Sequence, residues 1–164
     1  MRKFVSPTKG RLSQEDLYRD IVAFMEADRK SQYSLIVGTD SQPKSDAAVF
    51  VTAIVVHRVG RGARYYYMKT WERASKSIRQ RIYYETSLSL QVASDLSHFF
   101  SQNGYSELNV EIHCDIGVNG PTKELIKEIV GMIVGSGFSA RIKPDSFGAS
   151  TVADRFTKGG RRKA

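Results

Sequence analysis

Apolar and polar residues follow two different periods along this chain of 164 residues. Runs rich in Val, Ile, Phe and Tyr predict five strands, at about residues 34–42, 47–57, 63–71, 108–114 and 138–143. Apolar positions three or four residues apart predict four helices, at about residues 13–29, 77–102, 121–135 and 149–157. Short turns join the first three strands and predict an antiparallel meander, whereas helices separate the later strands, which favours parallel pairing.

The pattern therefore predicts an α/β fold. Its centre is a five-stranded mixed sheet, in which an antiparallel meander of three strands is joined by two parallel strands. Helices flank the sheet, and an extra helix precedes it, with Ser13 as its expected N-cap. The length suits one domain over residues 1–164, and residues 1–12 and 158–164 are expected to be flexible termini.

The composition is that of an ordinary soluble globular chain, with 41% hydrophobic and 26% charged residues. No apolar run approaches the roughly 18 residues that cross a bilayer, and the first ten residues have no apolar segment typical of a signal peptide. A single cysteine, Cys114, excludes an internal disulfide and fits a reducing compartment. We therefore expect a cytoplasmic protein that does not associate with a membrane.

Positive charge is concentrated in one segment. The chain carries a net charge of +8, and residues 58–81 hold eight bases against one acid, Glu72. Tyr65, Tyr66, Tyr67 and Trp71 are interleaved with these bases. Clustered bases with aromatic residues indicate a polyanionic partner, most plausibly nucleic acid. The alternative is a solvated basic face together with a basic tail over residues 158–164.

Three carboxylates occupy unexpected positions. Asp40 ends the buried run of the first long strand, where it either begins an Asx-turn or binds a cation. Glu85 lies in the apolar stripe of the long helix, where it needs a partner, either a cation or one of the nearby arginines. Asp115 closes the strand at about residues 108–114.

These carboxylates can converge. If the strands that end near Asp40 and Asp115 are parallel neighbours, both acids lie at the carboxyl ends of the strands, where open α/β sheets place their sites. Glu85 comes from the helix that crosses between those strands. Convergent carboxylates repel one another unless a cation holds them, and oxygen ligands suit Mg²⁺ or Mn²⁺.

Other chemistries fit the sequence less well. The three histidines lie far apart and there is one cysteine, so no familiar zinc spacing is present. No serine stands in a nucleophile-elbow motif, and no Walker-type glycine loop occurs. His113 is expected on a strand surface rather than as a ligand.

Four segments resemble the ribonuclease H-like superfamily and, within it, the YkuK-like family. They are GTDSQ at residues 38–42, YYETSLSL at 83–90, HCDIGVNGPTK at 113–123 and KPDSFGASTVADRFTK at 143–158. The resemblance implies a site of four carboxylates that match Asp40, Glu85, Asp115 and Asp154, with Asp145 as a rival for the fourth position. It also implies two Mg²⁺ or Mn²⁺ ions, with Asp40 bridging both.

The resemblance predicts a nuclease that hydrolyses phosphodiester bonds by a two-metal-ion mechanism. Its partner would be RNA, DNA or a hybrid, and Arg73, Lys76, Arg79 and Lys123 would hold the backbone of that nucleic acid. The alternative is a non-catalytic nucleic-acid-binding protein with the same fold. A third reading, a structural or assembly protein, predicts no metal affinity.

Overall fold

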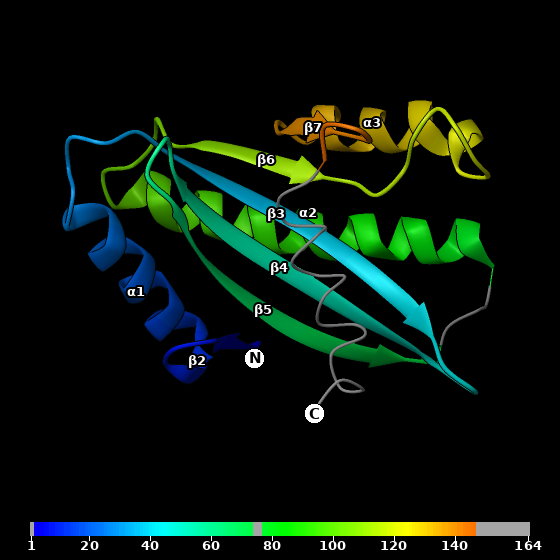
Figure 1. Cartoon of the computed structure of the whole chain (residues 1–164), viewed down its shortest axis with the longest axis horizontal. Helices are drawn as coiled ribbons and strands as arrows, with labels where there is room; N and C mark the ends of the chain where they lie inside the picture. The colour runs from blue at the N-terminus through cyan, green and yellow to red at the C-terminus, as the bar shows by residue number, and fades with distance from the viewer. Residues whose placement is uncertain (1, 74–76, 147–164) are drawn as a thin grey trace.

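The computed structural model of the protein describes residues 2–73 and 77–146. Seven strands form one sheet in the order β2-β1-β5-β4-β3-β6-β7 (Figure 1). The strands are β1 (Lys3–Ser6), β2 (Gly10–Ser13), β3 (Tyr33–Pro43), β4 (Ala48–Arg58), β5 (Ala63–Glu72), β6 (Asn109–His113) and β7 (Ser139–Arg141). The helices are α1 (Gln14–Glu26), α2 (Ile78–Gln102) and α3 (Ile126–Gly135), with a 3₁₀ turn, η1 (Lys123–Leu125), before α3. The helix predicted at residues 149–157 lies outside the described residues.

The mixed character of the sheet is confirmed. Strands β3, β4 and β5 pair antiparallel, as the short turns predict, whereas β6 pairs parallel with β3 and β7 parallel with β6. The pairing of β3 with β6 ends at Gly38 and His113. Strand β3 continues for five residues beyond that point with only β4 beside it in the described sheet.

The expectation of five strands is wrong, because the N-terminal residues add two more. Residues 3–13 form the hairpin β1–β2, and Val5 pairs with Tyr67 of β5, so the expectation of a flexible segment over residues 1–12 fails for this stretch. Burial explains the order, since the side chains of Phe4 and Ser6 are almost completely inaccessible to solvent. The Ser6 hydroxyl also accepts hydrogen bonds from the backbone of the tight turn between the two strands.

A buried ion network ties this hairpin to the rest of the fold. The Asp20 carboxylate on α1 accepts hydrogen bonds from Lys9 at 2.6 Å, Tyr66 at 2.5 Å and Arg64 at 3.3 Å. Burial alone would raise the pKa of Asp20, but the bonds from Lys9 and Tyr66 and the charge of Arg64 outweigh it and lower the pKa. The network therefore stabilises the ionised carboxylate.

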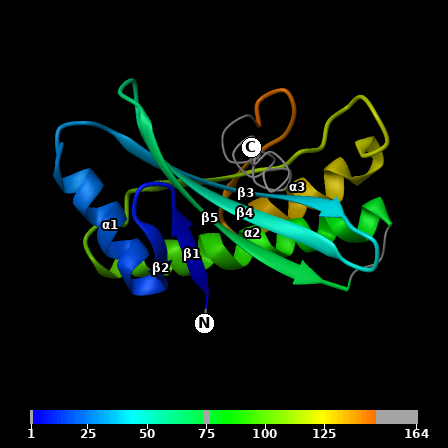
Figure 2. The ribbon, with the colours of Figure 1, turned by 60° about the horizontal axis from the view of Figure 1, so that its bottom comes forward.

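Both faces of the central strands are buried, which explains their nearly continuous apolar sequences. Helices α1 and α2 lie on the same side of the sheet (Figure 2), where Leu35 and Val37 of β3 join the main core. A second cluster on the opposite face contains Val49, Val51, Ala53 and Val55 of β4. Because side chains alternate along a strand, Ser41 faces α2 and Asp40 faces away from it.

Candidate metal and nucleic-acid site

The site lies at the open edge of β3. Since β6 leaves the sheet after His113, the last five residues of β3 have a free edge on that side in the described sheet. Helix α2 and the segment that follows β6 carry acidic side chains toward this edge. The carboxyl ends of β3 and β6 meet here, which is the usual place for a site in an open α/β sheet.

Glu85 is the carboxylate that α2 contributes. The Ser41 hydroxyl donates a hydrogen bond of 2.5 Å to Glu85 Oε2, and Arg81 Nη1 donates one of 3.1 Å to the same hydroxyl. Arg81 stands one helical turn before Glu85, so α2 presents the guanidinium and the carboxylate together. Among the described residues, the two charges are linked through Ser41 rather than by a direct ion pair. The alternative in which a nearby arginine compensates Glu85 therefore has a structural basis.

The surroundings of Glu85 favour its neutral form. Burial is the largest cause and raises the pKa of Glu85 to about 8, against an ordinary value of 4.5. The hydrogen bond from Ser41 and the charge of Arg81 lower the pKa, whereas the negative charges of Asp40 and Asp115 raise it. Without an added cation, Glu85 is therefore mostly protonated at neutral pH.

Buried hydroxyl groups hold α2 against the sheet beside Glu85. Thr39 Oγ1 lies 2.8 Å from Ser89 Oγ on α2 and 3.0 Å from Thr52 Oγ1 on β4. All three hydroxyl groups are buried, and each has a hydrogen-bond partner, as buried polar groups require. These hydrogen bonds set where α2 lies along β3 and therefore where Glu85 is placed.

Asp115 lies just beyond β6, across a small cavity from Glu85. The cavity measures about 10 Å³ and is lined by residues of α2, β3 and the end of β6, including Glu85, Asp115 and Cys114; that space suffices for about one water molecule. Asp115 is half-exposed and forms an ion pair of 3.0 Å with Lys143. Burial, together with the charges of Glu85 and Asp115, raises the pKa of the Cys114 thiol to about 12, so this thiol is unreactive.

Asp40 approaches the same edge from the other face of the sheet. It stands two residues beyond Gly38, and Asp115 stands two residues beyond His113, so the parallel register brings the two acids level with each other. Asp40 is close enough to Glu85 for its charge to raise the pKa of Glu85. The carboxylates from β3, α2 and the end of β6 are therefore electrostatic neighbours.

The carboxylate oxygens at the site are suitable ligands for a divalent cation, but the described side chains are too far apart to hold one together. Carboxylate oxygens are the ligands that Mg²⁺ and Mn²⁺ prefer, and a cation would offset the repulsion that neutralises Glu85. Within residues 2–73 and 77–146, however, no group of three or more His, Cys, Asp or Glu side chains lies close enough to hold a metal ion. Lys143 beside Asp115 and Arg81 beside Ser41 supply positive charge at the site. This charge offsets part of the repulsion among the carboxylates that a metal ion would otherwise offset.

The fourth carboxylate is not among these neighbours. Asp154, the residue that the resemblance favours, lies outside the described residues. Its rival Asp145 is exposed in the turn after β7, where its backbone N–H donates to the Ile142 carbonyl at 2.7 Å.

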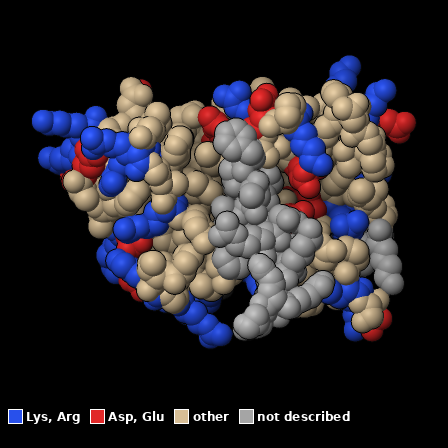
Figure 3. Space-filling model, in the orientation of Figure 1, with Lys and Arg blue, Asp and Glu red and all other residues tan. Residues whose placement is uncertain are grey.

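The four basic residues predicted to bind the phosphate backbone of a nucleic acid differ in their surroundings. Arg73 follows β5 and is exposed, and Lys123 is exposed at the start of η1. Arg79 is already engaged, because it lies 3.2 Å from Glu128 and its guanidinium stands 5.4 Å from the centre of the Tyr83 ring. Lys76 lies outside the described residues. Basic and acidic side chains both occur on the face shown in Figure 3, and a large basic group lies at its left end, over α1 and the β4–β5 turn.

Sequence reasoning missed Ser41, Arg81 and Lys143 as members of the site. Alternation along β3 and the four-residue spacing from Glu85 were available signals for the first two, whereas the pairing of Lys143 with Asp115 depends on tertiary structure. The surface position expected for His113 is wrong. The ring is buried, and its Nε2 lies 2.9 Å from the Glu111 carboxylate, because β7 and β3 flank β6 on both sides.

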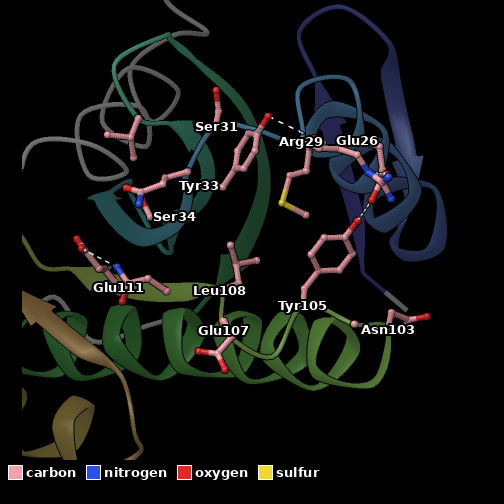
Figure 4. Close-up of a pocket in the computed structure, with 15 residues that line it drawn as sticks. Glu26, Arg29, Ser31, Tyr33, Ser34, Asn103, Tyr105, Glu107, Leu108 and Glu111 are labelled. Carbon is pink, nitrogen blue, oxygen red and sulfur yellow. Dashed lines mark hydrogen bonds and ion pairs between the residues drawn. The ribbon is translucent and has the colours of Figure 1, made fainter.

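A larger cavity, of about 910 Å³, lies at the opposite end of β3 and β6 (Figure 4). Tyr33 and Tyr105 line it, together with polar residues from α1 and the α2–β6 connection. The Tyr105 hydroxyl donates to Glu26, which also pairs with Arg29 at 2.7 Å. None of the predicted site residues within the described ranges lines this cavity.

Sequence comparison identifies the class of protein that this fold and site define. Residues 16–158 match the ribonuclease H-like family, and the chain therefore belongs to that family. The chain is also 38% identical, over 168 aligned residues, to a protein of Bacillus subtilis (strain 168) named "Uncharacterized protein YkuK"; the alignment covers 94% of this chain and 96% of that protein. Among the described residues, no helix has the length and apolar character needed to cross a membrane.

Proposed function

We propose that this protein is a divalent-metal-dependent nuclease that hydrolyses phosphodiester bonds. The observation that supports the proposal is that Asp40 of β3 and Asp115, just beyond β6, lie close enough to Glu85 of α2 to raise its pKa at one open sheet edge, in a chain of the ribonuclease H-like family. Asp40, Glu85 and Asp115 would hold Mg²⁺ or Mn²⁺. Asp154 is proposed as the fourth ligand.

A pair of bound ions would supply an activated water and a stabilised leaving oxygen. The residues of this chain would orient the ligands and supply positive charge beside them. Ser41 orients Glu85 by its short hydrogen bond, and Arg81 supplies a positive charge beside that pair. Lys143 pairs with one oxygen of Asp115, and we expect it to shift when that carboxylate binds a metal ion.

The partner that we propose is nucleic acid, RNA, DNA or a hybrid, held through its phosphates. Arg73 and Lys123 are exposed and ready for such contacts, and Lys76 is proposed with them. Arg79 can contribute only when a phosphate displaces Glu128.

Two observations favour a second function. The ion pair between Lys143 and Asp115 and the absence of a three-ligand group among the described residues are what a non-catalytic nucleic-acid-binding protein would show. Such a protein would keep the fold and bind without turnover.

Cleavage assays separate the two functions. Single-stranded and duplex RNA, DNA and hybrid substrates are incubated with the full chain in Mg²⁺, in Mn²⁺ and in EDTA. We expect metal-dependent products from at least one substrate, and loss of activity by Asp40→Asn and Asp115→Asn. Asp46→Asn is the matched control, since Asp46 is exposed in the β3–β4 turn. Binding without products in either metal would support the non-catalytic alternative, and products that persist in both variants would refute the proposed ligands.

A further inference from the structure

The single tryptophan of the chain, Trp71, is unusually exposed. It lies near the end of β5 with 60% of its surface accessible to solvent, although large aromatic side chains normally gain stability from burial. Exposed apolar surface of this kind commonly marks a binding site. Lys69, two residues earlier on the same strand, is also exposed.

The sheet register places both side chains on the face that carries Asp40. Asp40 pairs with Val51, and Val51 pairs with Lys69; on the next row, Val49 of β4 pairs with Trp71. Residues paired across a sheet share a face, so Asp40, Lys69 and Trp71 lie on the same side. Because neighbouring strands are roughly 4.8 Å apart, the backbones of Asp40 and Lys69 are about 10 Å apart.

The charge around Trp71 indicates what occupies this surface. Two exposed bases, Lys69 and Arg73, lie within two residues of Trp71 in the sequence, and the acid between them, Glu72, is turned to the other face, where it accepts a hydrogen bond from Tyr84. A protein partner would need only the apolar surface, whereas a nucleic acid uses both features. An indole ring stacks on any base, and an ammonium group beside it neutralises a phosphate.

We propose that Trp71 and Lys69 form a subsite for an unpaired base and its neighbouring phosphate at the exposed end of β5, so that the protein binds single-stranded nucleic acid there. The inference rests on the proposed function in one respect, since that proposal makes nucleic acid the partner of this protein. A base within a duplex is stacked on its neighbours and does not offer its face to Trp71. The subsite therefore selects single strands, or single-stranded segments of a larger substrate.

Tryptophan fluorescence tests this subsite without any cleavage. Because Trp71 is the only tryptophan, its emission reports directly on stacking. The full chain in EDTA is titrated with a short oligothymidylate, and then with a duplex of equal length. We expect saturable quenching by the single strand and much weaker quenching by the duplex. Equal quenching by both, or none by the single strand, overturns the proposal.

Two substitutions at the same position separate stacking from simple apolar contact. Binding of a labelled single strand is measured by anisotropy for Trp71→Phe, which keeps an aromatic face, and for Trp71→Leu, which does not. We expect Trp71→Leu to weaken binding by about 5- to 150-fold and Trp71→Phe by less than about 5-fold. Lys69→Gln should reduce the slope of log affinity against log salt by about 0.7. Equal binding by the Leu and Phe variants overturns the proposal, as does a dimer in sedimentation that Trp71→Leu dissociates.

The outcome is separable from that of the proposed nuclease function. Quenching and loss of binding in Trp71→Leu, without cleavage of any substrate, would support the subsite and refute the nuclease. Metal-dependent cleavage together with unchanged binding by Trp71→Leu would support the nuclease and overturn the subsite.

Discussion

The substitution Glu85→Gln should stabilise the metal-free protein at neutral pH. Glutamine keeps the size of Glu85 and an oxygen that can accept the hydrogen bond from Ser41. It cannot ionise, so it avoids both the burial of a charge and the repulsion from Asp40 and Asp115. The wild-type carboxyl must either stay protonated or, when ionised, destabilise the folded state through burial and repulsion.

The pKa of Glu85 sets the size of the effect. Its folded-state value of about 8 lies above the ordinary 4.5, so the folded protein holds the proton more tightly than the unfolded chain. The stability contributed by this group is fully present below about pH 4.5 and is lost as the pH rises toward 8. The loss approaches about 5 kcal/mol above pH 8 and is about 3 kcal/mol at pH 7, at about 1.4 kcal/mol for each pKa unit. For a domain of this length, about 3 kcal/mol corresponds to a change in Tm of roughly 6–12 °C.

The assay is urea unfolding in EDTA at pH 5, pH 7 and pH 9, followed by circular dichroism. We expect Glu85→Gln to exceed the wild type by about 3 kcal/mol at pH 7 and by more at pH 9, with little difference at pH 5. Glu107→Gln, at an exposed position, is the control and should not change the profile. A difference below about 1 kcal/mol at pH 9 would contradict the electrostatic account of Glu85.

Three further predictions follow from the same contacts. Arg81→Gln should extend the pH-dependent loss of stability to higher pH and enlarge it, because the charge of Arg81 lowers the pKa of Glu85 in the folded protein; an unchanged urea-unfolding profile would show that Arg81 does not act on that carboxyl. Asp20→Asn should cost about 1–3 kcal/mol at pH 7, since it weakens the hydrogen bonds that the buried carboxylate accepts from Lys9, Tyr66 and Arg64. Because the pKa of Asp20 is lowered, the wild type should lose this advantage below about pH 4, and equal acid sensitivity of both proteins would refute the role of the network. Arg73→Ala should reduce the salt dependence of nucleic-acid binding more than Arg79→Ala, which is paired with Glu128, and equal slopes would contradict this ranking.

The sequence was sufficient for the elements whose signals are local. The predicted ranges for β3, β4, β5 and α2 agree with the structure to within one or two residues at each end, because long β-branched runs, tight turns and a helical period each act over a few residues. The hairpin β1–β2 was missed for the opposite reason. Its strands have four residues each, too short for a clear period, and they are ordered by burial against distant parts of the chain.

In the candidate site, too, local signals were visible in the sequence, whereas contacts between distant residues were not. The anomaly of Glu85 in an apolar stripe was visible in the sequence, and it is reflected in the raised pKa. The contact of Arg81 with Ser41 joins residues 40 positions apart, and local patterns indicate only the faces on which the two residues lie. The contact of Lys143 with Asp115 joins residues 28 positions apart and depends on the fold alone. The face to which Asp40 points depends on strand register, which a one-residue shift would reverse.

Diffraction from crystals of the full chain soaked in Mn²⁺ tests the central claim most directly. The claim is that Asp40, Glu85 and Asp115 together hold a divalent cation at the open edge of β3. The account predicts anomalous density between these three carboxylates. Lys143 should be displaced from Asp115, and Glu85 should be ionised and bound to the metal. Density only at other positions, or an intact pair of Lys143 with Asp115 in crystals that hold Mn²⁺ elsewhere, would contradict it.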